Sequence, residues 1–165
     1  MDRPRGLTMN RFILSTDPVE AAVLQCDKHI VKMPLEEAQM LSSAHNELDG
    51  GQVAYKTAHK NHPCTVWVRE TRSNYLWAVA HWKALGEEYT RRYGKVHKSL
   101  KDHWETLSEP PRAIPDGPLT TFPQCMPDEC KSSDPVVGYM TYYNFKADDW
   151  DARGIPMKWY GREAV

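Results

Sequence analysis

One segment, residues 26–39, gathers side chains suited to acid–base and nucleophilic chemistry: Cys26, Asp27, Lys28, His29, Lys32, Glu36, Glu37 and Gln39. Successive residues of an α-helix are about 100° apart, so His29, Lys32 and Glu36 are expected on nearly one face. An imidazole, an amine and a carboxyl group held together form a candidate catalytic site. The simpler alternative is a solvated face on which Lys32 and Glu36 form an ion pair worth roughly 0.3 kcal/mol.

A second segment, residues 59–69, includes three potential zinc ligands: His59, His62 and Cys64. A fourth ligand would have to come from Cys26 or His29, and this spacing matches no closed structural zinc site. We therefore predict no bound metal and no other cofactor, and keep a zinc-dependent enzyme as an alternative. Without a metal, the histidines complete the hydrogen bonds at the start of a helix, or phosphates approach that helix N-terminus. The phosphate contacts would then come from His59, His62 and Arg69.

Basic residues are concentrated in a third segment, residues 91–101, although the whole chain has 21 basic and 22 acidic side chains and a formal net charge of −1. A near-neutral chain can still bind nucleic acid when its cations form local patches that neutralise phosphates. The candidates in this run are Arg91, Arg92, Lys95, His97 and Lys98. A smaller patch near the C-terminus adds Lys158, Trp159 and Tyr160. A solvated surface without a partner is the alternative for both.

Helices are expected to position these groups. One should begin at Pro18, because Asp17 is a good N-cap and Glu20 can complete a capping box. This helix is predicted to continue to about residue 45, with a kink or a division at Pro34. The later helices predicted are 63–94 with Gly94 as C-terminal cap, 95–107, and a last one that begins at Pro135.

The remaining chain is expected to be irregular. Residues 108–135 hold seven of the twelve prolines and should wrap over the helices, while strand signals are limited to residues 11–15. With 165 residues and 41% hydrophobic side chains, the chain has material for one core. The predicted fold class is mostly α: a compact single-domain helical bundle with a long Pro-rich irregular segment. Residues 1–8 would be an N-terminal extension and residues 9–165 the single helical domain.

The sequence also bears on location and redox state. No stretch approaches eighteen consecutive apolar residues, which argues against a membrane span or an ordinary secretion signal. We expect a cytoplasmic protein, in the host-cell cytoplasm if the chain is phage-encoded. In that compartment the four cysteines are expected to be free thiols. No oligomeric state is predicted.

Two short motifs carry a resemblance. The run Asp27-Lys28-His29-Ile30-Val31, with Glu36 seven residues after the histidine, resembles a segment of the phage pyrimidine-dimer DNA glycosylases of the endonuclease V type. The run Lys158-Trp159-Tyr160-Gly161-Arg162 is similar to the aromatic tail of that family, Lys-Tyr-Tyr-Gly-Lys. The chain is also similar to small uncharacterised phage proteins that open with Met-Asn-x-Phe.

The resemblance implies a reaction on DNA. In that family an α-amine at the mature N-terminus attacks the sugar C1′ of a flipped-out or distorted nucleotide and gives an imine, and a glutamate supports glycosidic cleavage and the following lyase step. Glu36 would take the carboxylate role, while His29 would orient it or contact phosphates. The implied partner is double-stranded DNA with a damaged or modified base.

The sequence departs from that family at the nucleophile. The family has a small residue after the initiator methionine, whereas here Asn10 follows Met9 and eight residues precede Met9. Translation from Met1 or from Met9 remains open. A lysine is the natural substitute for the amine, and Lys32 is the candidate ahead of Lys28. We predict a DNA glycosylase, with AP-lyase activity as a further step. The alternatives are a non-catalytic DNA-binding or host-interaction phage protein and the zinc-dependent enzyme.

Overall fold

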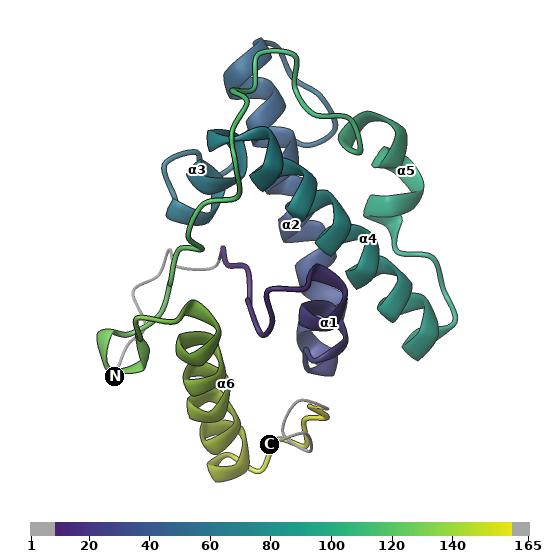
Figure 1. The fold of residues 1–165 in the computed structure, drawn as a ribbon. Helices are drawn as coiled ribbons and strands as arrows, with labels where there is room; N and C mark the ends of the chain where they lie inside the picture. Colours follow the sequence, from purple (N-terminus) through teal and green to yellow (C-terminus); the bar gives the residue numbers. More distant parts are fainter. Residues whose placement is uncertain (1–8, 160–165) are drawn as a thin grey trace.

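The fold is helical throughout the described part of the chain (Figure 1). The structure is a computed structural model and describes residues 9–159. Its elements are α1 (Pro18–Val23), α2 (Asp27–Asp49), α3 (Pro63–Glu70), α4 (Arg72–Tyr93), α5 (Lys98–Leu107), the 3-10 helix η1 (Asp128–Cys130) and α6 (Pro135–Ala152). Residues 9–159 contain no strand, which confirms the mostly-α prediction, and the weak strand signal over 11–15 does not produce a strand.

The two Asp-Pro pairs begin helices as predicted. Asp17 accepts a hydrogen bond from the amide of Val19 at 2.9 Å, and the equivalent contact at α6 joins Asp134 to the amide of Val136. Proline costs nothing in a first turn, because its missing N–H would have no helical partner there. The predicted capping box is wrong, since Glu20 instead accepts from the Ser15 hydroxyl at 3.0 Å.

The breaks between helices fall at other places than Pro34. The chain leaves the helical path at residues 24–26, and α2 then runs through Pro34 to Asp49. Packing against α3, α4 and α5 supports α2 on several sides, which offsets the hydrogen bond that proline removes. The second block divides at Thr71, whose backbone is extended and whose hydroxyl caps α4. Gly94 ends α4 in the left-handed region, at φ 70°, as predicted.

The core lies where α2 and α4 cross, with α1, α3 and α5 packed around them (Figure 1). Trp67, Trp82 and Tyr75 are among its largest fully buried side chains. Helix α6 stands beside the segment that precedes α1, because Tyr139 and Tyr143 pack on the ring of Phe12.

The Pro-rich connection between α5 and α6 is irregular apart from η1, as predicted. It is tied to the helices by side-chain contacts: Asp49 accepts from the amides of Arg112 and Ala113, and Asn74 exchanges two hydrogen bonds with Thr120. These contacts hold a long loop in one path without regular structure. Among the helices described here, none combines the length and apolar character needed to cross a bilayer.

Candidate active site

A buried ion pair connects the segment before α1 to α2. Arg11 donates from Nε to Oε2 of Glu37 at 2.9 Å and from Nη2 to Oε1 at 2.5 Å, and both side chains are 2% exposed. A further hydrogen bond runs from Nη1 to the carbonyl of Cys64 at 3.2 Å. Arg11 therefore fixes its segment against α2 and α3, and the carboxylate of Glu37 is fully engaged.

The neighbouring carboxyl group is in a different state. Glu36 is 6% exposed, and its Oε2 atom is buried without a hydrogen-bond partner among the described residues. Burial raises the pKa of Glu36 to about 7; the charge of Lys32 opposes this shift and that of Glu37 adds to it. Both protonation states of Glu36 are therefore populated near neutral pH, which is the range useful for acid–base chemistry.

His29 lies about two turns before Glu36 on the same face of α2 and is also buried. Its ring stacks on Phe12 with the centroids 4.1 Å apart, and Nδ1 shares a short hydrogen bond of 2.5 Å with the hydroxyl of Tyr143. Burial lowers the pKa of His29 well below its usual value, and nearby lysines lower it further. The imidazole is therefore neutral at pH 7, and its orientation is fixed from both sides.

Cations surround this pair of groups. Lys28 and Lys32 are exposed on α2, and Lys146 comes from α6, where its Nζ lies 4.6 Å from the centroid of the Tyr142 ring. All three contribute to the lowered pKa of His29. The site is therefore electropositive although the whole chain has a net charge of −1.

The solvated-face alternative for this helix fails. His29 and Glu36 are buried, and within residues 9–159 Lys32 makes no ion pair with Glu36. The structure brings the three predicted catalytic residues to one side of α2, with the imidazole and carboxyl group inside and the amine in solvent.

The C-terminal patch divides between surface and interior. Lys158 is exposed, and its carbonyl accepts from the amide of Asp27 at 3.0 Å. Trp159 is 6% exposed and packs on Tyr143 with the ring centroids 5.0 Å apart, so it is part of the wall behind His29. Tyr160 lies outside the described residues.

The histidine-rich segment forms the start of α3. Nδ1 of His62 accepts from the amide of Cys64 at 3.1 Å, which is the helix-capping role considered for it. His59 is exposed with a positive φ of 49°, and Arg69 donates to the carbonyl of Lys60 at 2.7 Å. The Arg69 side chain therefore reaches from the last turn of α3 back to the segment before this helix.

The basic run at the end of α4 is partly neutralised. Arg91 and Arg92 both pair with the buried carboxylate of Glu88, and Arg92 also pairs with Asp27 at 3.0 Å. Lys95 and Lys98 are exposed. His97 caps α5 by accepting from the amide of Ser99 at 3.2 Å.

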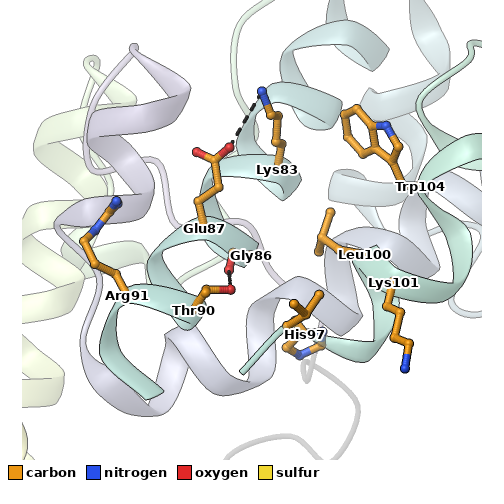
Figure 2. A pocket seen from close by; sticks show the side chains of 10 residues that line it. Lys83, Gly86, Glu87, Thr90, Arg91, His97, Leu100, Lys101 and Trp104 are labelled. Carbon is orange, nitrogen blue, oxygen red and sulfur yellow. Dashed lines mark hydrogen bonds and ion pairs between the residues drawn. The ribbon is translucent and has the colours of Figure 1, made fainter. Parts of the chain in front are cut away.

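An open pocket of about 610 Å³ lies between α4 and α5. Figure 2 shows the Lys83–Glu87 ion pair on one wall and Trp104 with Lys101 on the α5 side. The lining residues are Lys83, Gly86, Glu87, Thr90, Arg91, Val96, His97, Leu100, Lys101 and Trp104. Of the five charged or titratable side chains in this lining, all except Glu87 are basic in type, which makes this a second electropositive region.

This pocket and Glu36 lie on different sides of α2. The α5 end contacts α2 through a hydrogen bond between His97 and the carbonyl of Val31, at 3.2 Å, and a weak one from Ser99 to the carbonyl of Pro34, at 3.5 Å. Helix geometry places Pro34 about 160° around the axis from Glu36. The site around Glu36 and the α4–α5 pocket are therefore separate.

Sequence reasoning did not identify four residues that shape the site: Arg11, Phe12, Tyr143 and Lys146. Their contacts with α2 span 17 to more than 100 positions in the chain, so no local spacing reports them. The pair of adjacent glutamates was a usable signal. If both carboxyl groups are buried, at least one of them needs a buried cation such as Arg11 as its partner.

A buried carboxyl group with a raised pKa shares a helix face with a fixed imidazole, and three lysines lie near that imidazole. This arrangement is suited to acid–base chemistry on an anionic substrate. The family model of pyrimidine dimer DNA glycosylases matches residues 9–102, from the segment that carries Arg11 into α5. The chain therefore belongs to the pyrimidine dimer DNA glycosylase family, as the resemblance of its α2 motif suggested. No curated protein and no solved structure matches the chain significantly.

Membership in this family implies glycosylase activity on DNA that contains pyrimidine dimers. The matched range includes His29, Lys32 and Glu36, together with the basic run before α5. It ends before α6 and the C-terminal tail, which supply Tyr143, Lys146 and Trp159 to the same site.

Proposed function

We propose that this chain cleaves the glycosidic bond of a damaged or modified base in double-stranded DNA, with pyrimidine dimers as the first substrate to test, and that Glu36 is its catalytic carboxyl group. The observation that carries the proposal is the state of Glu36: buried, with one oxygen unpartnered and a pKa of about 7. A carboxyl group held this way is available to a substrate rather than committed to the fold.

The proposed reaction begins with an uncharged amine that attacks the sugar C1′. The N–C1′ bond forms as the glycosidic bond breaks. The departing base keeps the bonding electrons and takes up a proton, and the attacking nitrogen loses one. In a cyclobutane dimer this base stays joined to its neighbour through the cyclobutane ring. The carboxylate of Glu36 stabilises the positive charge that develops on the sugar. Loss of the ring oxygen from C1′ then gives an imine. In the lyase step a base removes a proton from C2′, and the 3′ phosphate leaves.

Lys32 is the proposed amine, because it shares a helix face with His29 and Glu36 and lies closest to Glu36 in that row. The α-amine of a chain that begins at Met9 is the competing nucleophile. That possibility has a physical basis, since Arg11 and Phe12 contact Glu37 and His29 and so bring the start of the described chain to α2.

DNA is proposed to approach along the exposed side of α2. Going round the helix axis, Val31 next to α5 is followed by Lys28, Lys32 and then Glu36. Lys95, exposed just before α5, and Lys98, exposed at its first position, are proposed to continue this row of cations. The row links the two electropositive regions, so that a phosphate backbone can contact both while one nucleotide is extruded towards Glu36.

The other predicted DNA contacts form three further groups. Around α3 they are His59, His62 and Arg69; between the end of α4 and the start of α5 they are Arg91, Arg92 and His97; at the C-terminus they are Lys158, Trp159 and Tyr160. For His62, Arg92 and Trp159 the proposed role is positioning rather than direct contact, because each is engaged within the protein.

The experiment uses end-labelled duplexes that carry a cyclobutane pyrimidine dimer, uracil or an abasic site, with undamaged duplex as control. We expect glycosidic cleavage in the dimer duplex, detected as an alkali-labile abasic site because the cyclobutane ring keeps the detached base joined to its neighbour. With borohydride present, we expect a covalent protein–DNA adduct. Peptide mapping of the adduct by mass spectrometry distinguishes Lys32 from the α-amine. Lys32→Gln should abolish trapping if Lys32 is the nucleophile, and Lys56→Gln, an exposed lysine elsewhere, should not change it.

Each negative result has a defined meaning. Glycosidic cleavage without a trapped adduct rejects the amine mechanism and leaves a hydrolytic glycosylase. Binding to all duplexes with neither abasic-site formation nor strand cleavage rejects the enzyme and identifies a non-catalytic DNA-binding protein.

A further inference from the structure

Three side-chain atoms that could bind a metal ion lie close together at the start of α3. His62, Cys64 and Cys125 each offer one ligand atom, and these atoms lie within 4.8 Å of one another. The two sulfur atoms are 3.5 Å apart, so they are in contact but not bonded. The reaction proposed above uses neither sulfur.

The fold fixes each of these ligands from outside the cluster. Nδ1 of His62 is occupied by the amide of Cys64, which sets the ring orientation and leaves Nε2 as the free nitrogen. Nε2 is buried and has no hydrogen-bond partner among the described residues. Cys64 is held in the first turn of α3, where its carbonyl accepts from Arg11. A buried nitrogen without a partner normally costs free energy, so its persistence calls for an explanation.

Cys125 comes from the Pro-rich connection and is anchored on two sides. Its amide donates to the hydroxyl of Tyr139 at 3.2 Å, and its carbonyl accepts from Nδ2 of Asn10 at 2.9 Å. Oδ1 of Asn10 lies 3.9 Å from Sγ of Cys64. The cluster is therefore where α3, the Pro-rich connection and the segment before α1 meet.

The ligand types and spacing select a metal. Two thiolates and one imidazole suit zinc and are poor ligands for calcium or magnesium, which prefer oxygen. In a tetrahedral zinc site with Zn–S bonds of about 2.3 Å, two sulfur ligands lie about 3.8 Å apart. The observed 3.5 Å needs only a small adjustment.

We propose that Nε2 of His62, Sγ of Cys64 and Sγ of Cys125 bind one zinc ion, with water as the fourth ligand. Cys125 is partly exposed, which gives water access to that position. Binding releases the protons of two thiols. The role is structural, because the ion joins α3 to the Pro-rich connection beside Asn10 and so stiffens the segment that delivers Arg11 to Glu37. The proposal does not depend on the glycosylase activity.

This site differs from the zinc set considered from the sequence. Two of those ligands, His62 and Cys64, are retained. His59 is exposed and is not part of the cluster, while the third ligand lies 61 positions after Cys64 and could not be anticipated from spacing.

The test measures metal in the full chain, purified without chelators, by mass spectrometry of the element and by cobalt substitution. We expect one zinc ion per chain. After the zinc is removed, Co²⁺ should give the intense visible bands of a tetrahedral site and a near-ultraviolet sulfur-to-cobalt band. Cys125→Ser and His62→Gln should weaken zinc binding at least tenfold in a competition with a chromophoric chelator. Cys125→Ser is the safer variant because its side chain is partly exposed.

Matched controls separate the cluster from other thiols and histidines. Cys130→Ser changes a buried cysteine outside the cluster, and His59→Gln changes the exposed histidine, so both should retain one zinc ion. The proposal is overturned if the reduced chain takes up no zinc at stoichiometric concentration, if the controls lose the metal as the cluster variants do, or if Cys64 and Cys125 are isolated as a disulfide that forms in place of metal binding.

Discussion

Glu36 and Glu37 are adjacent in α2 and both buried, yet the two faces of the helix on which they lie have opposite character. On the Glu37 face, Arg11 satisfies the carboxylate with short, nearly parallel hydrogen bonds. On the Glu36 face, the carboxyl group has an unpartnered oxygen and a pKa of about 7. The comparison shows how one helix supports the fold with one glutamate and keeps the next available for chemistry.

The two faces are coupled through the segment before α1. Arg11 reaches Glu37, and the following residue, Phe12, stacks on His29 beside Glu36. The ion pair between Arg11 and Glu37 therefore positions Phe12 against His29. Replacing a residue on one face should change mainly catalysis, and replacing one on the other should change mainly stability.

The largest expected effect is on catalysis and comes from Glu36→Gln. The amide keeps the size of the side chain but cannot carry the negative charge that stabilises the sugar cation, so cleavage of dimer-containing DNA should fall about 10²–10⁴-fold. Single-turnover kinetics on the labelled duplex measure this loss, and DNA affinity should stay unchanged. Glu47→Gln, at an exposed position of the same helix, is the control. Normal cleavage by Glu36→Gln would remove Glu36 from the mechanism.

The next effect is on stability and concerns the other face. Arg11→Met or Glu37→Leu leaves one partner of a buried ion pair uncompensated, and each should lower the free energy of unfolding by about 3–5 kcal/mol. Urea denaturation measures the change. In a double-mutant cycle, Arg11→Met combined with Glu37→Leu should recover much of the loss, because no buried charge remains. Additive losses in the double variant would show that the two residues act independently.

A smaller effect is the pH dependence of stability that Glu36 creates. Its pKa is about 7 in the folded chain, against about 4.3 in an unfolded chain. Between these values the folded chain keeps a proton that the unfolded chain has released, so the free energy of unfolding falls as pH rises, by at most roughly 3 kcal/mol at pH 8. Urea denaturation at pH 4.5 and pH 8 should reveal this fall in the native chain, and Glu36→Gln should lack it. Equal pH dependence in both proteins would mean that Glu36 has an ordinary pKa.

Local signals in the sequence predicted most of the helices. Asp17-Pro18, Asp134-Pro135 and Gly94 each mark a helix end through their own backbone preferences, and all three ends are confirmed. A division of the helix at Pro34 was wrong because packing on several sides of α2 outweighs a local preference. The division at Thr71 was missed because no strong breaker residue marks it.

The site was only half accessible from the sequence. Helical spacing alone places His29, Lys32 and Glu36 on one face, since that relation is local. The difference between Glu36 and Glu37 is not local, because it depends on Arg11, which lies 26 positions before Glu37. The contact between Cys64 and Cys125 could not be predicted either, because it depends on the path of the Pro-rich connection through space.

The smallest expected effect distinguishes the Glu36 side of α2 from the α5 side. If the DNA backbone extends past α2, Lys95→Gln and Lys98→Gln should each make the logarithm of the DNA-binding constant less dependent on the logarithm of salt concentration, by about 0.9 per lost phosphate contact, and leave the single-turnover rate of bound DNA unchanged. Fluorescence anisotropy over a range of salt concentrations measures the slope. Lys56→Gln, an exposed lysine outside this surface, is the control. Unchanged slopes in both variants would confine the DNA to the Glu36 side, because a cation that contacts phosphate releases a counterion whatever the base sequence.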